Sequence, residues 1–155
     1  MFGKAPGMPV IRPAKIDDVA ALKYCAEAAY EKYVIRMGKK PAPMVADFSA
    51  LVEQKTVHVL DVDNKVCGFI VCYVRHDHFY IENIAVDPAH HGQGYGKQLM
   101  DFAEVQTRAR GFSRLELYTN EKMWENLKLY PRLGYTEFAR ISQDGFNRVF
   151  FYKNL

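Results

Sequence analysis

Residues 87–98 read DPAHHGQGYGKQ and place three glycines at alternate positions, after a run of β-branched and aromatic residues and before an amphipathic segment. Glycine removes the side chains that would keep an anion away from the backbone, and the first N–H groups of a helix have no partner within the helix. Lys97 adds a formal positive charge in the predicted first turn. The stretch therefore predicts a strand that ends at Asp87-Pro88, a turn of bare amides, and a helix whose N-terminus holds an anionic group.

Two familiar phosphate-binding loops do not fit this stretch. A P-loop needs GxxxxGK followed by Ser or Thr, but His91 stands five residues before Gly96 and Gln98 follows the lysine. A dinucleotide fingerprint needs GxGxxG, and Lys97 occupies its last position. A glycine-rich turn that only connects a strand to a helix remains the alternative.

The segments around the glycine turn predict an α+β fold. Before it, β-branched and aromatic runs with turns at Asp63-Asn64 and His76-Asp77 indicate three consecutive antiparallel strands. After it, helical spacing that stops at Gly111 and at Gly134 indicates two helices, and a Gln143-Asp144-Gly145 turn indicates a final hairpin. The predicted strands are 10–14, 56–60, 66–74, 79–86 and 115–119 plus the hairpin, and the predicted helices are 16–33, 48–55, 93–110 and 121–133.

These elements predict one mixed, mostly antiparallel central sheet flanked by helices. We expect a single domain over residues 9–155, with residues 1–8 a disordered extension or tag remnant. Asp17 or Asp18 is the expected cap of the first helix.

Composition excludes several classes of protein. Of 155 residues, 49% are apolar and 25% are charged, and no apolar run is long enough to span a bilayer, so we expect a globular, cytoplasmic protein without a secretory signal. The net charge of +3 is dispersed, which argues against a nucleic-acid partner.

We expect Cys25, Cys67 and Cys72 to be buried, reduced thiols. The histidines lack the ligand spacing of a zinc site, so no metal is expected.

The segment IENIAVDPAHHGQGYGKQLM resembles the GNAT superfamily of N-acetyltransferases, whose loop pattern is Arg or Gln, two residues, Gly, one residue, then Gly or Ala. Gly94 and Gly96 match the glycine positions, and His91 stands where Arg or Gln is usual. The resemblance implies the acyl-CoA N-acyltransferase fold. It also implies that acetyl-CoA binds here, with its pyrophosphate on the loop and its pantetheine arm on the backbone of the preceding strand. The implied cofactor-binding residues are Ile84, Ala85, Val86, His91, Gly92, Gln93, Gly94, Tyr95, Gly96 and Lys97.

A second segment, TNEKMWENLKLYPRLGYTEF, also resembles the family through Leu129-Tyr130 and Gly134-Tyr135. The resemblance implies that Tyr130 donates a proton to the departing CoA thiolate. Asn126 lies one helical turn before Tyr130, on the same helix face, and is expected to reach the cofactor arm. A core aromatic with its hydroxyl bonded to the backbone is the alternative for Tyr130.

Glu82 is the expected base. It precedes Ile84 and Val86 by two and four residues, on one face of a regular strand, and a carboxylate there would accept the amine proton through water. The backbone N–H of Val86 or its neighbour is the expected donor to the carbonyl oxygen. A structural or solvent-facing glutamate is the alternative, and His90 or His91 is a second candidate base.

The sequence thus predicts an enzyme, an acetyl-CoA-dependent N-acetyltransferase, acting as a monomer or homodimer on a small primary amine. A protein amino group as acceptor and a non-catalytic acyl-CoA sensor are the alternatives. Family resemblance places the acceptor near the two early helices and their connecting loop, residues 37–44. The candidate acceptor contacts there are Tyr24, Tyr30, Tyr33 and Arg36.

Overall fold

A computed structural model describes residues 7–155, so most of the expected extension lies outside the described residues. The fold is the predicted α+β fold, with one seven-stranded sheet in the order β1-β2-β3-β4-β5-β7-β6, in which β4 and β5 pair in parallel. The strands are β1 (Val10–Pro13), β2 (Val57–Val62), β3 (Lys65–Arg75), β4 (His78–Val86), β5 (Arg114–Asn120), β6 (Thr136–Gln143) and β7 (Phe146–Asn154). The helices are α1 (Val19–Met37), α2 (Phe48–Glu53), α3 (Tyr95–Ala109) and α4 (Trp124–Arg132), with short 3-10 turns at Ile16–Asp18, Ala42–Val45 and Pro88–His90.

The chain forms two compact units, whose boundaries fall inside β3, β4 and α3. The first unit holds the residues up to Val71 together with Asn83–Phe102, and the second holds Cys72–Glu82 together with Ala103–Leu155. The single domain expected over residues 9–155 stays a prediction.

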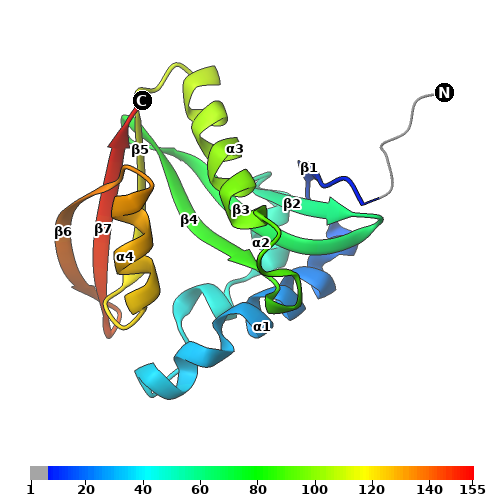
Figure 1. The fold of residues 1–155 in the computed structure, drawn as a ribbon, viewed down its shortest axis with the longest axis horizontal. Helices are drawn as coiled ribbons and strands as arrows, with labels where there is room; N and C mark the ends of the chain where they lie inside the picture. Colours follow the sequence, from blue (N-terminus) through cyan, green and yellow to red (C-terminus); the bar gives the residue numbers. More distant parts are fainter. Residues whose placement is uncertain (1–6) are drawn as a thin grey trace. The chain divides into compact units, whose positions relative to one another are not determined.

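In the first unit, β1 and β2 run side by side in Figure 1 and pair antiparallel, as β2 does with β3. Phe48 of α2 packs edge-on against Phe69 of β3, with ring centroids 5.4 Å apart, and both side chains are fully buried. Gly68 brings β3 close to the end of β4, because a Cβ at this position would lie 2.9 Å from the carbonyl oxygen of Ala85. Apolar burial and this close approach fix the strand that leads into the glycine turn.

In the second unit, β5 pairs with β7, and β7 pairs with β6, both antiparallel. Figure 1 shows α4 beside β7, and Tyr130 of α4 packs against Phe151 of β7. The predicted hairpin turn is confirmed: Asp144 and Gly145 have φ values of 53° and 79°, the left-handed conformation that a two-residue type I′ turn requires.

Two helices begin later than predicted. Helix α3 begins at Tyr95 rather than residue 93, because Gly92 and Gly94 take left-handed conformations that a helix does not admit. Helix α4 begins at Trp124 rather than residue 121, because the side-chain oxygen of Asn120 accepts the N–H of Lys122 at 2.9 Å and closes a local turn.

The predicted cap at Asp18 has another role. Its carboxylate accepts the N–H of Lys15 at 2.7 Å and forms an ion pair with Arg12 at 2.8 Å, which holds the pKa of Asp18 below its usual value. This side chain makes no capping bond to the first turn of α1.

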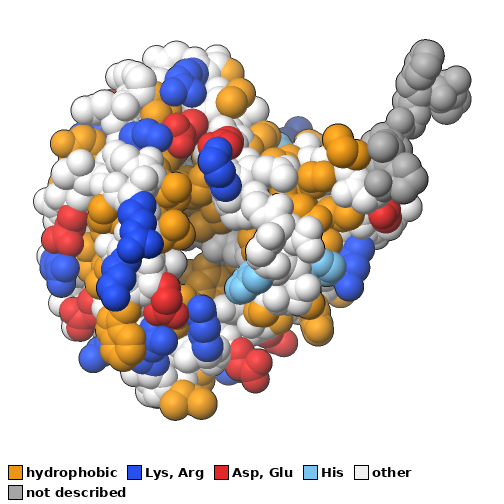
Figure 2. Space-filling model, in the orientation of Figure 1, with side chains coloured by type: hydrophobic (Ala, Val, Ile, Leu, Met, Phe, Trp, Pro, Cys, Tyr) orange, Lys and Arg blue, Asp and Glu red, His pale blue; other side chains and the backbone are white. Residues whose placement is uncertain are grey.

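Within residues 7–155, no helix combines the length and apolar character needed to cross a bilayer. On the face that Figure 2 shows, Lys and Arg side chains are interspersed with Asp and Glu side chains. The three cysteines Cys25, Cys67 and Cys72 are free and buried, and burial raises the pKa of the Cys25 and Cys72 thiols to about 12.

Candidate active site

The glycine turn between β4 and α3 belongs to the first unit. Gly92 and Gly94 have φ values of 80° and 79°, and a Cβ built at either position would meet nothing within 4 Å. These glycines are therefore required by backbone conformation and not by crowding. Their backbone amides can approach a ligand that a larger side chain would hold off.

Gly96 differs from the other two glycines. Its φ lies outside the left-handed range, and a Cβ there would make an ordinary 3.9 Å contact with Cγ2 of Val86. An alanine would fit, which agrees with a loop pattern that admits Gly or Ala at this position.

Lys97 and His91 already have partners around the turn. The ammonium of Lys97 forms an ion pair with Asp101, one turn along α3, at 2.8 Å. Nε2 of His91 lies 3.3 Å from the carbonyl oxygen of Val86. Lys97 would have to leave Asp101 before it could contact a phosphate.

The backbone at the end of β4 is partly engaged. The carbonyl oxygen of Ile84 accepts from the hydroxyl of Tyr30 at 2.9 Å, and the N–H of Asp87 donates to the carbonyl oxygen of Cys67 at 2.9 Å. Asp87 therefore cannot offer its N–H to a ligand without giving up this bond. The expected donor at Val86 stays a prediction.

Sequence reasoning missed a buried network around Asn83, which is 3% exposed. The hydroxyl of Tyr30 lies 2.9 Å from the Oδ1 of Asn83 as well as from the Ile84 carbonyl oxygen, so its single proton is shared between two acceptors. The amide nitrogen of Asn83 donates to the carbonyl oxygen of Pro43 at 3.1 Å. The network fastens the Ala42–Val45 turn to β4. The sequence signal for it is weak: an asparagine follows Glu82 within a strand that is mostly apolar.

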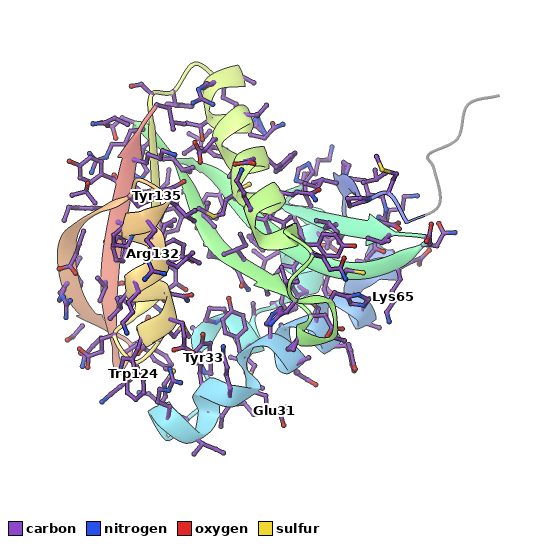
Figure 3. All side chains as sticks on the ribbon, in the orientation of Figure 1. Glu31, Tyr33, Lys65, Trp124, Arg132 and Tyr135 are labelled. Carbon is purple, nitrogen blue, oxygen red and sulfur yellow. The ribbon has the colours of Figure 1, made fainter. Side chains whose placement is uncertain are left out.

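Two other residues expected to contact the acceptor differ in exposure. Tyr24 is exposed, whereas Tyr33, which Figure 3 shows on α1, is buried with the charged ends of Lys32 and Arg36 at 5.0 and 5.2 Å from its ring centroid. Tyr30, as described above, is a buried structural residue. Tyr30 and Tyr33 therefore pack within this unit, whereas Tyr24 is open to solvent.

Glu82 belongs to the second unit, where it accepts a hydrogen bond from the hydroxyl of Tyr73 at 3.0 Å. Burial, and then the nearby Glu82 carboxylate, raise the pKa of Tyr73 to about 12. The phenol consequently stays protonated at neutral pH and remains a donor to Glu82.

Aromatic side chains of the second unit surround Glu82, and Tyr73, Tyr80, Tyr118 and Phe150 together are called the tyrosine face. The rings of Tyr73 and Tyr80 lie 5.8 Å apart, and Tyr80 stacks on Tyr118 at 6.3 Å with an interplanar angle of 13°. Tyr118 in turn contacts Phe150 at 5.9 Å. Burial raises the pKa of both Tyr80 and Tyr118. Sequence analysis did not find this face, because its members come from four strands whose register is not visible in the chain.

Tyr130 and Asn126 lie on the other face of the sheet in the second unit. Tyr130 is buried against Phe151 and Tyr135, with ring centroids 5.6 and 6.1 Å away, and Phe151 follows Phe150 in β7. Figure 3 shows Trp124 and Arg132 at the two ends of α4 and Tyr135 beyond its end. Because neighbouring residues in a strand point to opposite faces, Tyr130 and Glu82 approach this sheet from opposite sides.

Asn126 does not project freely from its helix. Its amide nitrogen donates to Oγ1 of Thr119 at 3.1 Å and lies 3.8 Å from the sulfur of Met123. Asn126 therefore links α4 to β5 and shares the face of Tyr130.

The described residues 7–155 contain no group of three or more His, Cys, Asp or Glu side chains placed to hold a metal ion. The Nε2 atom of His90 is buried without a hydrogen-bond partner among these residues, so this nitrogen is not accessible as a base.

A family model described as the Acetyltransferase (GNAT) family matches residues 21–135. This chain belongs to the GNAT family. The resemblance that the glycine turn suggested is thereby confirmed, and the matched span includes both the turn and Tyr130.

Individual relatives of this GNAT protein agree with the assignment. The [ribosomal protein bS18]-alanine N-acetyltransferase of Haemophilus ducreyi is 34% identical over 76 residues, which cover 49% of this chain and 52% of that protein. An uncharacterised N-acetyltransferase of Methanocaldococcus jannaschii is 26% identical over 79% of this chain and 57% of its own length. The chain thus spans about half the length of these curated relatives.

The fold has a close counterpart among solved structures. The PaiA N-acetyltransferase of Thermoplasma acidophilum, crystallised in complex with coenzyme A, superposes with a TM-score of 0.78 over 96% of this chain and 99% of its own. At 15% identity, this match supports the GNAT fold and no particular acceptor.

Proposed function

We propose that this GNAT protein is an enzyme that transfers the acetyl group of acetyl-CoA to a primary amine. The glycine turn carries the proposal: two left-handed glycines with open space above them precede the first turn of a 15-residue helix. Backbone amides at such a junction fit a phosphate, since they combine unpaired donors with the positive end of the helix dipole. Residues 91–97 would hold the pyrophosphate, and Ile84, Ala85 and Val86 would bind the pantetheine arm.

Acetyl-CoA supplies an acyl group activated as a thioester. The amine must lose its proton to attack, because an ammonium ion has no lone pair. Glu82 takes this proton, directly or through a water molecule, while the nitrogen bonds to the acetyl carbon and the carbon–sulfur bond breaks. Tyr130 supplies a proton to the departing sulfur, and the N–H of Val86 donates to the carbonyl oxygen.

Two acceptors are considered. A small primary amine is our first candidate. A protein amino group is the second candidate. Its support is the 34% identity, over 76 residues, to an enzyme named for a ribosomal-protein alanine.

Thiol release tests the proposal. The purified protein, given acetyl-CoA and a panel of amines and amino-terminal peptides, should release CoA only when an acceptor is present. Tyr130→Phe should lower kcat by about 100-fold with little change in CoA affinity, because it removes the proton donor and keeps the ring. A protein that binds CoA by calorimetry but shows no acceptor-dependent release would be a sensor module, and one that ignores CoA would overturn the assignment.

A further inference from the structure

The tyrosine face around Glu82 carries three arginines, and they are not equivalent. Arg114 stacks over Tyr152 at 4.0 Å and has a carboxylate partner, Glu116, at 2.7 Å. Arg75 stacks over Tyr80 at 4.7 Å, and Arg148 stacks over Tyr118 at 4.9 Å. Neither of these two forms an ion pair with a carboxylate among residues 7–155; Arg148 donates only to the amide oxygen of Gln143 at 3.1 Å.

Ring contacts connect these two arginines into one row. Tyr80 and Tyr118 are stacked on each other, so the row runs Arg75, Tyr80, Tyr118, Arg148. Glu82 lies beside this row, two residues after Tyr80 on the same strand and bonded to Tyr73, whose ring contacts Tyr80. The surface therefore offers one carboxylate for a cation and two guanidinium groups for an anion.

Charge on this face favours a doubly charged ligand. Glu116 is already neutralised by Arg114 and also lies 3.3 Å from His78. The remaining charges are one carboxylate, Glu82, and two guanidinium groups, Arg75 and Arg148, so this face carries a local excess of positive charge. A simple diamine or polyamine would satisfy Glu82 and be repelled by the guanidinium groups, whereas a group with a carboxylate would pair with them.

We infer that the acceptor is an amine that also carries a carboxylate a few ångströms away, with its ammonium at Glu82 and its carboxylate on Arg75 or Arg148. The inference rests on the proposed acetyl transfer and names the substrate class of that reaction. An amino acid-like small molecule and a peptide whose second residue is acidic share this chemistry. The rings of Tyr73 and Tyr118, which are partly exposed, would lie along the apolar part of either ligand.

Matched acceptors test the inference on the wild-type protein. The pairs are 4-aminobutyrate with 4-aminobutanamide, and the peptide amides Ala-Glu-Ala and Ala-Gln-Ala, each assayed by thiol release. The acid should exceed the amide in kcat/KM by about tenfold in at least one pair, because one charge-assisted contact distinguishes the two members. The pair that shows the preference identifies the small-molecule or the peptide source.

Substitutions then locate the preference. The double substitution Arg75→Gln/Arg148→Gln should bring the acid-to-amide ratio to within about twofold of unity, chiefly through KM for the acid. Arg140→Gln, which removes an exposed arginine paired with Glu137, should keep the wild-type ratio. Equal use of acid and amide by the wild type, or a ratio that survives the double substitution, would overturn the inference. Absence of thiol release with every amine would instead contradict the proposed function itself.

Discussion

The two units differ in the kind of group that each presents as candidate site residues. In the first unit the glycine turn and the end of β4 present backbone groups, and side chains such as Tyr30 and Asn83 serve to hold that backbone in place. In the second unit the candidate functional groups are side chains, with Glu82 among tyrosines and arginines on one face and Tyr130 on the other. A backbone site suits a cofactor shared by a whole family, and a side-chain site suits an acceptor that differs between members.

Removing the carboxylate of the second unit should have the largest effect. Glu82→Gln keeps the size of the side chain and a partner for Tyr73 but cannot take a proton, so kcat/KM should fall by about 100-fold or more, measured by thiol release. CoA affinity should change little, because the substitution leaves the glycine turn and residues 84–86, which are proposed to bind the cofactor, unaltered. Glu53→Gln, at an exposed position of α2, serves as the control. Full activity in Glu82→Gln would show that Glu82 is not the base and that His91 or solvent takes the proton.

Altering the backbone of the first unit should give the opposite pattern. Gly94→Ala forces a side chain into a left-handed conformation, which costs about 1–2 kcal/mol, and we expect CoA to bind about tenfold more weakly by calorimetry. Gly111→Ala is the matched control, since Gly111 follows α3, has a φ of 80° and has open space around it. Both variants should lose similar stability, but only Gly94→Ala should lose affinity. Equal CoA affinity in the two variants would show that the turn does not bind the cofactor.

The network that holds the first unit's backbone should have a smaller, structural effect. Tyr30→Phe leaves the oxygens of Asn83 and Ile84 without their shared donor, and it should lower the free energy of unfolding by about 1–2 kcal/mol in urea titrations. Tyr24→Phe, at a position that is 66% exposed, should leave it unchanged. Unaltered stability in Tyr30→Phe would mean that the bond to Ile84 does not support the strand.

The smallest expected effect is a loss of folding stability at alkaline pH, caused by Tyr73 of the second unit. The pKa of Tyr73 rises from 10.0 to about 12 in the folded protein, so the unfolded chain releases this proton first. The stability that Tyr73 contributes is therefore present below about pH 10 and is lost as the pH rises toward 12. Urea midpoints between pH 9 and pH 11 should fall more steeply for the wild type than for Tyr73→Phe, and parallel curves would contradict the assignment.

The same contrast explains how much the sequence could predict. The order of strands and helices, the hairpin turns and the glycine turn all followed from local patterns, because left-handed glycines and strand periodicity depend on neighbours in the chain. The starts of α3 and α4 were placed too early, since the geometry of Gly94 and the side-chain bond of Asn120 override helical spacing.

Features that depend on partners far apart in the sequence were not predicted. The contact of Tyr30 with Asn83 joins residues 53 positions apart, and nothing local marks either residue as its partner. The stack of Tyr80 on Tyr118 depends on a register in which Tyr80 pairs with Glu116 across a parallel ladder. Only the paired sheet places these rings together with Arg75 and Arg148.

Gly68 leaves the chain little freedom where β3 meets the end of β4. Even a methyl group at this position would collide with the carbonyl oxygen of Ala85, a backbone atom that cannot rotate away, and would also press on Leu99 at 3.3 Å. Any redesign of the end of β4 must therefore keep glycine at residue 68.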